Sequence, residues 1–405
     1  MKLPLEGVNV LDLTHALAGP FCSTMLADYG AHVIKLEAFG AGDIARTWGT
    51  PLPGGETAYF AALHRNKKCI EINLKHARGK ELFFDMVERC DIVIENFRVG
   101  TLKKLGLDYD KARARNPGII YCSISGFGQS GPYKDRAALD LILQAESGMI
   151  SVTGEPPDLG GRGVRCGVSI ADLTAGLNAA FGIMAALRVK EKTGRGQQVD
   201  VSMMEGQMSL LNTIIGNYQV DGKIPGPMGT AYTALTPYQT FRTQTKDFAL
   251  AVGSEKLWKT FCPAIGHPEL TDDPRYAHNQ MRTKNRGTLI PRLQEIFMTR
   301  TFEAWEKILI GSGIPFGALN NIAQVVEHPQ VAARGSMIEI NHPKVGRTKI
   351  VGPVAKLSET PATIRSMSPT LGEHTHEVLR EFLGLQPEAI AALRSAGVIA
   401  DKDAP

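Results

Sequence analysis

One carboxylate in the sequence stands where a catalytic nucleophile could lie. Asp172 follows the strand-like segment 167–170 and begins an apolar segment, 172–190, that we expect to be helical. Aspartate is favoured in the first turn of a helix, where its oxygens accept backbone N–H bonds. The same N–H groups could stabilise charge on an acyl oxygen, and an ionised carboxylate can act as a covalent nucleophile. Asp172 is therefore predicted either to cap the helix or to do covalent chemistry.

Basic and amide side chains collect where a predicted strand ends. Asn96, Phe97 and Arg98 follow the strand-like segment 91–95, and Lys104 lies at the start of the next helix. Ligands of doubly wound sheets bind beyond the carboxyl ends of the strands. Arg98 is therefore a candidate contact for an anion. The alternative is that these charges are simply solvated on the surface.

Several common signatures are absent from the sequence. The first strand-to-helix turn reads THALAGP, which lacks the GxGxxG pattern of dinucleotide-binding folds. No ATP-type phosphate loop, HExxH motif or GxSxG motif occurs. The six cysteines form no CxxC pair and no zinc-like cluster with the ten histidines. We therefore predict no metal site and expect reduced thiols in a cytoplasmic protein.

Composition narrows the classes of protein that remain. The 405 residues carry a net charge of +4, too small for a dedicated nucleic-acid binder. The opening MKLPLEGVNVLDLTHALAGP carries charge and proline too early for a signal peptide. We find no run of about 18 apolar residues in the sequence, so we expect no membrane span.

Strand-like and helix-like segments alternate through the first 200 residues. This order predicts an α/β fold with a parallel, doubly wound sheet. A Pro- and Gly-rich stretch at 220–227 marks a change of character, and a second, smaller domain follows it. The predicted strands are 8–13, 32–36, 70–74, 91–95 and 118–124, and the predicted helices between them are 20–29, 76–90 and 102–115.

Taken in order, many segments of the chain resemble those of the family III CoA-transferases, the formyl-CoA and carnitine-CoA transferase group. Each motif is weak alone, but the ordered set covers nearly the whole chain and is specific. The segments are LEGVNVLDLTHALAGPFCSTMLADYGAHVIKLE, GDIAR, NKKCIEINLK, DIVIENFRVGTLKKLGLDY, NPGIIYCSISGFGQSGP, LDLILQAESG, GVSIADLTAG, TGRGQQVDVSM, DDPRY, GIPFGALN, HPQVAARG and LGEHTHEVL.

The resemblance implies a fold that composition could not show. Family members have a Rossmann-like, doubly wound large domain and a smaller α+β domain, and two chains form an interlocked dimer. On this basis we expect a large CoA-binding domain of residues 1–200 and 326–405, a linker at 201–224 and a small domain at 225–325.

The resemblance also implies a mechanism and a set of CoA contacts. The family's nucleophilic aspartate aligns with Asp172, which would attack an acyl-CoA thioester and then carry CoA as an aspartyl thioester. No ATP is needed, because the thioester is conserved, and CoA is a substrate rather than a prosthetic group. The CoA contacts implied are Leu17, Ala18, Ala38, Ile72, Asn73, Leu74, Lys75, Asn96, Phe97, Arg98, Lys104 and Arg136.

The chain departs from the formyl-CoA transferases at several positions. Those enzymes have Gln at the position of Leu17, Arg at the position of Ala38, and a glycine run that closes over the site. The nearest candidate for that run here is Gly226–Gly229. These differences disfavour formyl-CoA and oxalate as substrates, and Ala38 has no charge to offer a phosphate.

Two other functions stay open from the sequence. The related 2-methylacyl-CoA racemases need a second proton-transfer group, which they take from a Gly-His-Asp triplet. Here the corresponding residues are Ala138, Leu139 and Asp140, so the racemase ranks second. A noncatalytic CoA-binding subunit ranks third, since Asp172 could persist there as a cap.

The substrates follow least directly from the sequence. Arg46, Arg65 and Arg165 are candidate clamps for a second carboxylate, because arginine binds carboxylates bidentately. Our hypothesis is transfer from succinyl-CoA to a C4 or C5 dicarboxylate such as malate, citramalate or glutarate. A carnitine-type or aromatic acceptor, and a related second subunit, remain open alternatives.

Overall fold

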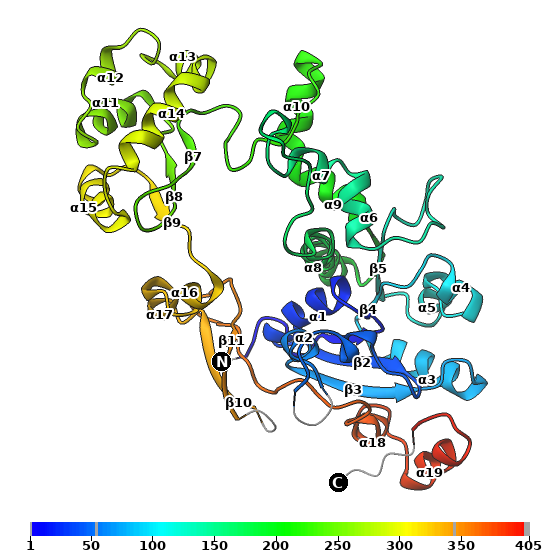
Figure 1. Ribbon diagram of the computed structural model, residues 1–405. Helices are drawn as coiled ribbons and strands as arrows, with labels where there is room; N and C mark the ends of the chain where they lie inside the picture. Colours follow the sequence, from blue (N-terminus) through cyan, green and yellow to red (C-terminus); the bar gives the residue numbers. More distant parts are fainter. Residues whose placement is uncertain (1, 53–55, 343–345, 401–405) are drawn as a thin grey trace. The chain divides into compact units, whose positions relative to one another are not determined.

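The computed structural model describes residues 2–52, 56–342 and 346–400, and the chain divides into two compact units (Figure 1). The larger, unit 1, comprises residues 1–149, 166–222 and 332–405. The smaller, unit 2, comprises residues 150–165 and 223–331. Each unit is described by itself.

A six-stranded parallel sheet forms the centre of unit 1. Its order is β3-β2-β1-β4-β5-β6, which is the strand order of dinucleotide-binding, doubly wound sheets. All five strand pairs are parallel, so the predicted α/β fold with a parallel sheet is confirmed. The strands are β1 (Asn9–Asp12), β2 (His32–Ala38), β3 (Lys67–Ile72), β4 (Ile92–Glu95), β5 (Ile120–Ser125) and β6 (Gln198–Ser202).

Helices and short turns connect these strands and complete unit 1. They are α1 (Ala18–Asp28), η1 (Ile44–Thr47), α2 (Ala58–Leu63), α3 (Ala77–Val87), α4 (Thr101–Leu105), α5 (Tyr109–Arg115), α6 (Asp140–Glu146), α7 (Met149–Val152, at the unit boundary), α8 (Ile170–Thr193), α9 (Met203–Leu210), α10 (Asn212–Asp221), α18 (Thr375–Glu377), η3 (Val378–Phe382) and α19 (Pro387–Ser395). A separate two-stranded ribbon pairs β10 (Met337–His342) with β11 (Gly346–Val351).

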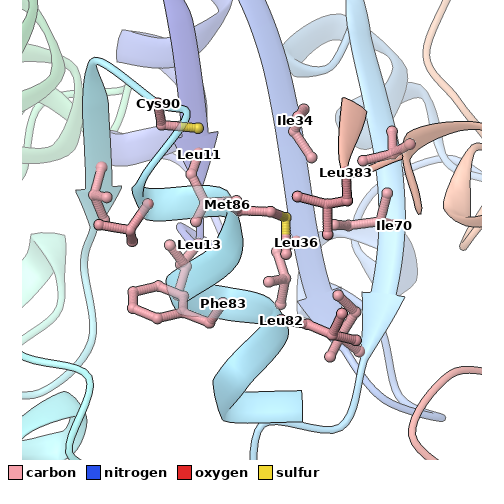
Figure 2. Packing of buried hydrophobic residues seen from close by; sticks show 14 of the residues in the cluster. Leu11, Leu13, Ile34, Leu36, Ile70, Leu82, Phe83, Met86, Cys90 and Leu383 are labelled. Atoms are coloured by element: carbon pink, nitrogen blue, oxygen red, sulfur yellow. The ribbon is translucent and has the colours of Figure 1, made fainter. Parts of the chain in front are cut away.

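Both faces of the sheet are apolar, because successive side chains of a strand point to opposite faces. Along β4, Ile92 and Ile94 face the core that contains α1 and α8, whereas Val93 faces the core that contains α3. Figure 2 shows this second core, where α3 turns Phe83 and Met86 toward the strands. Their spacing is that of one helix face, which explains why α3 forms a helix and buries this side.

Helix α8 approaches α1 closely enough to position its first turn. A Cβ atom at Gly176 would lie 2.7 Å from the Ala18 carbonyl oxygen, so only glycine allows this approach. Ala171, Ala175 and Ala179 bury the same small-residue face. The helix then ends at Gly194, whose φ of 70° suits a left-handed C-cap. The start of α8, with Asp172, is thereby held beside the start of α1.

By length and composition alone, α8 could cross a membrane, although we expected no such segment. In the structure it packs against α1, β5 and β6. Such packing is typical of the core helix of a folded domain, so the apolar composition of α8 has a structural reason.

Unit 2 has its own sheet and core. The antiparallel strands β7 (Tyr238–Phe241), β8 (Phe248–Ala251) and β9 (Phe316–Ala318) pack with helices around an aromatic core that includes Trp258, Phe297 and Trp305. The other elements are η2 (Pro157–Leu159), α11 (Glu255–Ala264), α12 (Glu269–Asp272), α13 (Asn279–Lys284), α14 (Arg286–Phe297), α15 (Phe302–Ser312), α16 (Ile322–Val326) and α17 (Pro329–Ala333, at the unit boundary).

The units differ in detail from the domain boundaries expected from the sequence. Residues 201–224, expected to form a linker, hold the end of β6 and the helices α9 and α10. Unit 2 also includes residues 150–165, which precede α8 in the chain and were placed in the large domain. Residues 332–405 belong to unit 1, where Val398 accepts a backbone hydrogen bond from Asn73.

Candidate active site

The strand order of the sheet creates a crevice between the loops that follow β1 and β4. The strands β1 and β4 are neighbours in the sheet. The chain continues from β1 to β2 on one side and from β4 to β5 on the other side, so the loops that follow β1 and β4 run apart. Ligands of doubly wound sheets bind at such a switch point. Two cavities open here, of about 430 and 640 Å³. We call the first the Asp172 cavity and the second the β2–β3 cavity.

Most of the predicted site residues lie around these two cavities. Ala18, Asn96, Phe97, Arg98 and Arg136 line the Asp172 cavity together with Asp172 itself. The β2–β3 cavity is lined by Phe97 as well as by Ala38, Ile72, Asn73, Leu74 and Lys75.

Two of the predicted contacts lie elsewhere. Leu17 and Lys104 line neither cavity; Leu17 is half-buried just before α1, and Lys104 is exposed on α4. The structure therefore places the other predicted CoA contacts around the two cavities without these two.

Asp172 does not cap α8, because another carboxylate does so. Asp140 Oδ1 accepts the Ala171 N–H at 2.8 Å, and its Oδ2 accepts a hydrogen bond from Gln144 at 2.7 Å. Gln144 in turn accepts the Cys166 N–H at 2.8 Å. Among the described residues, the Asp172 carboxylate has no hydrogen-bond partner, so the site keeps both of its oxygens available for reaction.

The surroundings of Asp172 make it unusually basic for a carboxylate. Burial, and secondarily the negative charge of Asp140, raise its pKa to about 7. Tyr59 on α2 is also affected: burial raises its pKa to about 12, and the charges of Asp172, Asp43 and Asp140 contribute. Its phenol therefore stays protonated at neutral pH and offers an O–H donor beside these carboxylates.

In the loop after β1, three consecutive backbone N–H groups donate hydrogen bonds to side-chain oxygens. Thr14 donates to Asp12 at 2.9 Å, His15 donates to Asn96 at 2.9 Å, and Ala16 donates to Asp43 at 3.0 Å. The Asn96 amide also donates to the His15 carbonyl at 2.8 Å. The Asn96 side chain, predicted to contact CoA, is thus occupied with His15 and acts by positioning this loop.

Buried ion pairs fix the carboxylates that hold the loop. Lys35 lies 2.9 Å from Asp43, and Lys67 lies 3.3 Å from Asp12, with all four side chains essentially inaccessible to solvent. Burial alone would favour neutral Asp12, but Lys67 and Lys35 lower its pKa to about 2. Removal of one partner would leave a buried charge unpaired, so the loss of any member of this cluster should destabilise the loop.

Two of the three arginines predicted to bind a second carboxylate of the substrate instead pair with carboxylates of the protein itself. Arg46 donates two hydrogen bonds to Glu37, at 2.9 and 2.6 Å, and stacks on Phe60. Arg65 forms a bidentate pair with Asp28. Neither arginine lines the Asp172 cavity, so both serve the structure of unit 1. Arg165 is exposed in unit 2.

Three cations do line the Asp172 cavity. Arg98 donates to the Asp135 carbonyl, with Nε at 3.0 Å. Arg136 forms an ion pair with Glu146 and lies over the rings of Phe127 and Tyr133. The third is Lys134.

His15 and Tyr59 are the candidate functional residues that sequence reasoning missed. His15 follows the first strand in THALAGP, and its place at a strand end could have drawn attention to it. Tyr59 lies in no motif, and only the fold brings it near Asp172. In the described ranges no group of three or more His, Cys, Asp or Glu residues is arranged to hold a metal ion.

A family profile described as CoA-transferase family III matches residues 5–375. The chain belongs to this family. Human succinyl-CoA:glutarate CoA-transferase is 40% identical over 396 residues, covering 98% of this chain and 90% of the relative. Succinyl-CoA–D-citramalate CoA-transferase of Chloroflexus aurantiacus is 36% identical, covering 98% of each chain. The solved structure of a CAIB/BAIF family protein from Brucella suis has a TM-score of 0.83 at 36% identity, covering 95% of this chain and all of that one.

These matches settle the class of enzyme. The protein is a family III CoA-transferase whose relatives include enzymes of succinyl-CoA and dicarboxylates. Enzymes of this family act on CoA thioesters. Asp172 lines one of the two cavities described above.

The raised pKa of Asp172 predicts a pH dependence. Nucleophilic attack needs the ionised carboxylate, so kcat/KM should fall about tenfold per unit of pH below about 7. In Asp140→Asn, the amide oxygen still accepts the Ala171 N–H, whereas the hydrogen bond from Gln144 is lost and the negative charge is gone, which should shift this acid limb to lower pH. The pH profile of kcat/KM measures both. An unshifted limb, or a shift to higher pH, would mean that Asp140 does not set the charge of Asp172.

The same pKa predicts an effect on stability. Since the pKa of Asp172 in the folded chain exceeds its ordinary value, the folded state loses stability as the pH rises from about 4 through about 7. Asp172→Asn carries no charge and should gain Tm relative to the wild type across this window, most of all above pH 7. Thermal unfolding at pH 5 and pH 8 tests this, and a variant less stable than the wild type at pH 8 would return Asp172 to a capping role.

Proposed function

We propose that the enzyme transfers CoA from succinyl-CoA to a C4 or C5 dicarboxylate, with glutarate, citramalate and malate as candidate acceptors, through covalent intermediates on Asp172. The observation that carries the mechanism is a half-buried carboxylate that faces a cavity, caps no helix and has a pKa of about 7. The names of the relatives support the substrates.

The proposed reaction balances without ATP or metal. An Asp172 oxygen attacks the thioester carbonyl, the C–S bond breaks, and CoA departs as the thiolate. The succinyl group is then joined to the aspartate as a mixed anhydride. The thiolate attacks the Asp172 carbonyl and releases succinate, which leaves an aspartyl-CoA thioester. The acceptor carboxylate then attacks this thioester, and the thiolate finally attacks the acceptor carbonyl. Each step exchanges one acyl bond for another, so the energy of the thioester is retained.

In this proposal CoA extends through both cavities. Its thioester lies in the Asp172 cavity, and the rest of the molecule passes Phe97 into the β2–β3 cavity beside Ala38 and Ile72–Lys75. Arg98, Lys134 and Arg136 supply positive charge at the Asp172 cavity for the phosphates of CoA or the distal carboxylate of the acid.

We further propose that two chains form an interlocked homodimer. Leu177, Phe181 and Met184 are exposed on one face of α8, at the spacing of an apolar helical stripe. A second copy of the chain would cover this face. The cytoplasmic location stays part of the same proposal, and it rests on buried cysteines such as Cys22, Cys90 and Cys122, which form no disulfide bond among the described residues.

The transfer reaction can be tested directly. Wild-type protein should convert succinyl-CoA and glutarate into glutaryl-CoA and succinate without ATP, and it should prefer dicarboxylates to monocarboxylates of equal length. Asp172→Ala should lower kcat by at least about 10³-fold, while the variant still binds CoA. Mass spectrometry of mixed donors and acceptors measures the products.

Other outcomes of that assay would change the assignment. Equal rates with monocarboxylates would remove the dicarboxylate proposal. If no new thioester forms but a branched acyl-CoA exchanges its α-proton in heavy water, the racemase alternative gains support. Binding of CoA without either reaction would favour a noncatalytic subunit.

The dimer has its own test. Phe181→Glu places a charge on the exposed apolar face and should yield monomer or unassembled protein by light scattering. Arg78→Glu, which changes an exposed arginine on α3 in a similar ion pair with Glu81, is the matched control away from this stripe and should leave the dimer intact. A dimer that tolerates Phe181→Glu would show that this face is not the interface.

A further inference from the structure

One side chain with hydrogen-bonding capacity lies where the two cavities meet. Among their described lining residues, only His15 and Phe97 belong to both the Asp172 cavity and the β2–β3 cavity. The two rings lie 5.3 Å apart between centroids. Phe97 offers an apolar surface, whereas the imidazole of His15 offers one N–H donor and one acceptor nitrogen.

The fold holds the backbone of His15 on both sides. The Asn96 side chain binds its N–H at 2.9 Å and its carbonyl at 2.8 Å. The next residue, Ala16, has a φ of 66°, a left-handed conformation that is unfavourable for alanine. The bond from its N–H to Asp43 stabilises this conformation. Strained backbone of this kind persists where surrounding contacts over-determine it, and often at functional sites.

The side chain of His15, in contrast, is uncommitted. Within the described part of the chain, neither of its ring nitrogens has a hydrogen-bond partner. The ring is half-buried and lines both cavities, so these nitrogens are open to a bound molecule. Burial lowers the pKa of His15. The negative charge of Asp43 opposes this shift, and the positive charge of Lys35 adds to it. The imidazole is therefore neutral at physiological pH and keeps a single proton to donate.

The proposed transfer needs a donor at this place. When the C–S bond breaks, the sulfur gains a full negative charge close to Asp172 and Asp140. The thiolate must stay near the anhydride until it attacks the Asp172 carbonyl. A fixed N–H group aimed at the sulfur would stabilise the charge as it develops.

We propose that His15 is a further catalytic residue, whose imidazole N–H donates a hydrogen bond to the CoA sulfur as the thiolate departs and returns. This inference rests on the proposed function. The electron pair of the C–S bond goes to sulfur, the new C–O bond forms at Asp172, and the proton stays on His15 throughout. The same hydrogen bond forms in each of the four acyl exchanges, because each one releases or consumes the thiolate.

Two substitutions at one position separate catalysis from structure. The clamps from Asn96 bind only the backbone of His15, so they survive a change of side chain. His15→Leu removes the donor, whereas His15→Asn keeps an N–H donor on a smaller side chain. We expect kcat to fall about 100-fold in His15→Leu and less than about tenfold in His15→Asn, with KM for succinyl-CoA nearly unchanged in both.

The assay should not depend on the identity of the acceptor. Exchange of isotope between succinyl-CoA and labelled succinate uses only the donor acid and passes through both the anhydride and the aspartyl-CoA thioester. If wild-type protein exchanges label but does not use other dicarboxylates, the proposed acceptor fails and His15 can still be tested. If the wild type does not exchange label, the proposed function itself fails.

The outcomes for His15 are then distinct. Slow exchange in His15→Leu with rescue by His15→Asn supports the proposal. Equal losses in the two variants, or a rise in KM without a change in kcat, would assign His15 to packing or CoA binding and overturn it. Full activity in His15→Leu would overturn it as well.

Discussion

The hydrogen bond between Asp140 and the first turn of α8 is the interaction on which the site depends. A helix start needs an acceptor for its free N–H groups, and Asp140 supplies it from α6, through the Ala171 N–H. Asp172 is thereby released from the role that its position in the helix would otherwise give it. Burial, and secondarily the charge of Asp140, raise the pKa of Asp172, so Asp140 both leaves the proposed nucleophile without a capping role and contributes to its pKa.

The remainder of unit 1 builds the crevice in which the proposed nucleophile lies. The sheet order opens a crevice between the β1 and β4 loops, and buried pairs such as Lys35 with Asp43 keep the β1 loop in place. The close approach of α8 to α1 at Gly176 sets Asp172 at the edge of this crevice. The proposed nucleophile is thereby kept in a poorly solvated place, where stability is given up for function.

The sequence predicted those features that depend on local pattern. Apolar runs such as 91–95 are typical of strands buried on both faces, and alternation with helices indicated the parallel sheet that the structure confirms. The ordered motifs indicated the family, which the comparisons confirm. Asp172 was singled out from its place at the start of a helix, and the structure adds that it lines a cavity.

Features that depend on tertiary contacts could not be read in this way. The partner of the α8 N-terminus lies 31 residues away in the chain, at Asp140. Arg46 and Arg65 were expected as clamps, but the fold gives each a carboxylate partner first. The place of His15 between two cavities follows from hydrogen bonds to Asn96, which is 81 residues distant. No local pattern encodes such pairings.

The most direct test of a covalent role for Asp172 follows the oxygen atoms. In the proposed sequence an ¹⁸O-labelled acceptor acid loses one oxygen to the enzyme in each turnover, because the bridging oxygen of the second anhydride stays on Asp172. After several turnovers with succinyl-CoA, mass spectrometry of the peptide that contains Asp172 should show ¹⁸O in that side chain. An unlabelled Asp172 after the same number of turnovers would contradict the covalent account and indicate direct transfer between the two bound acids.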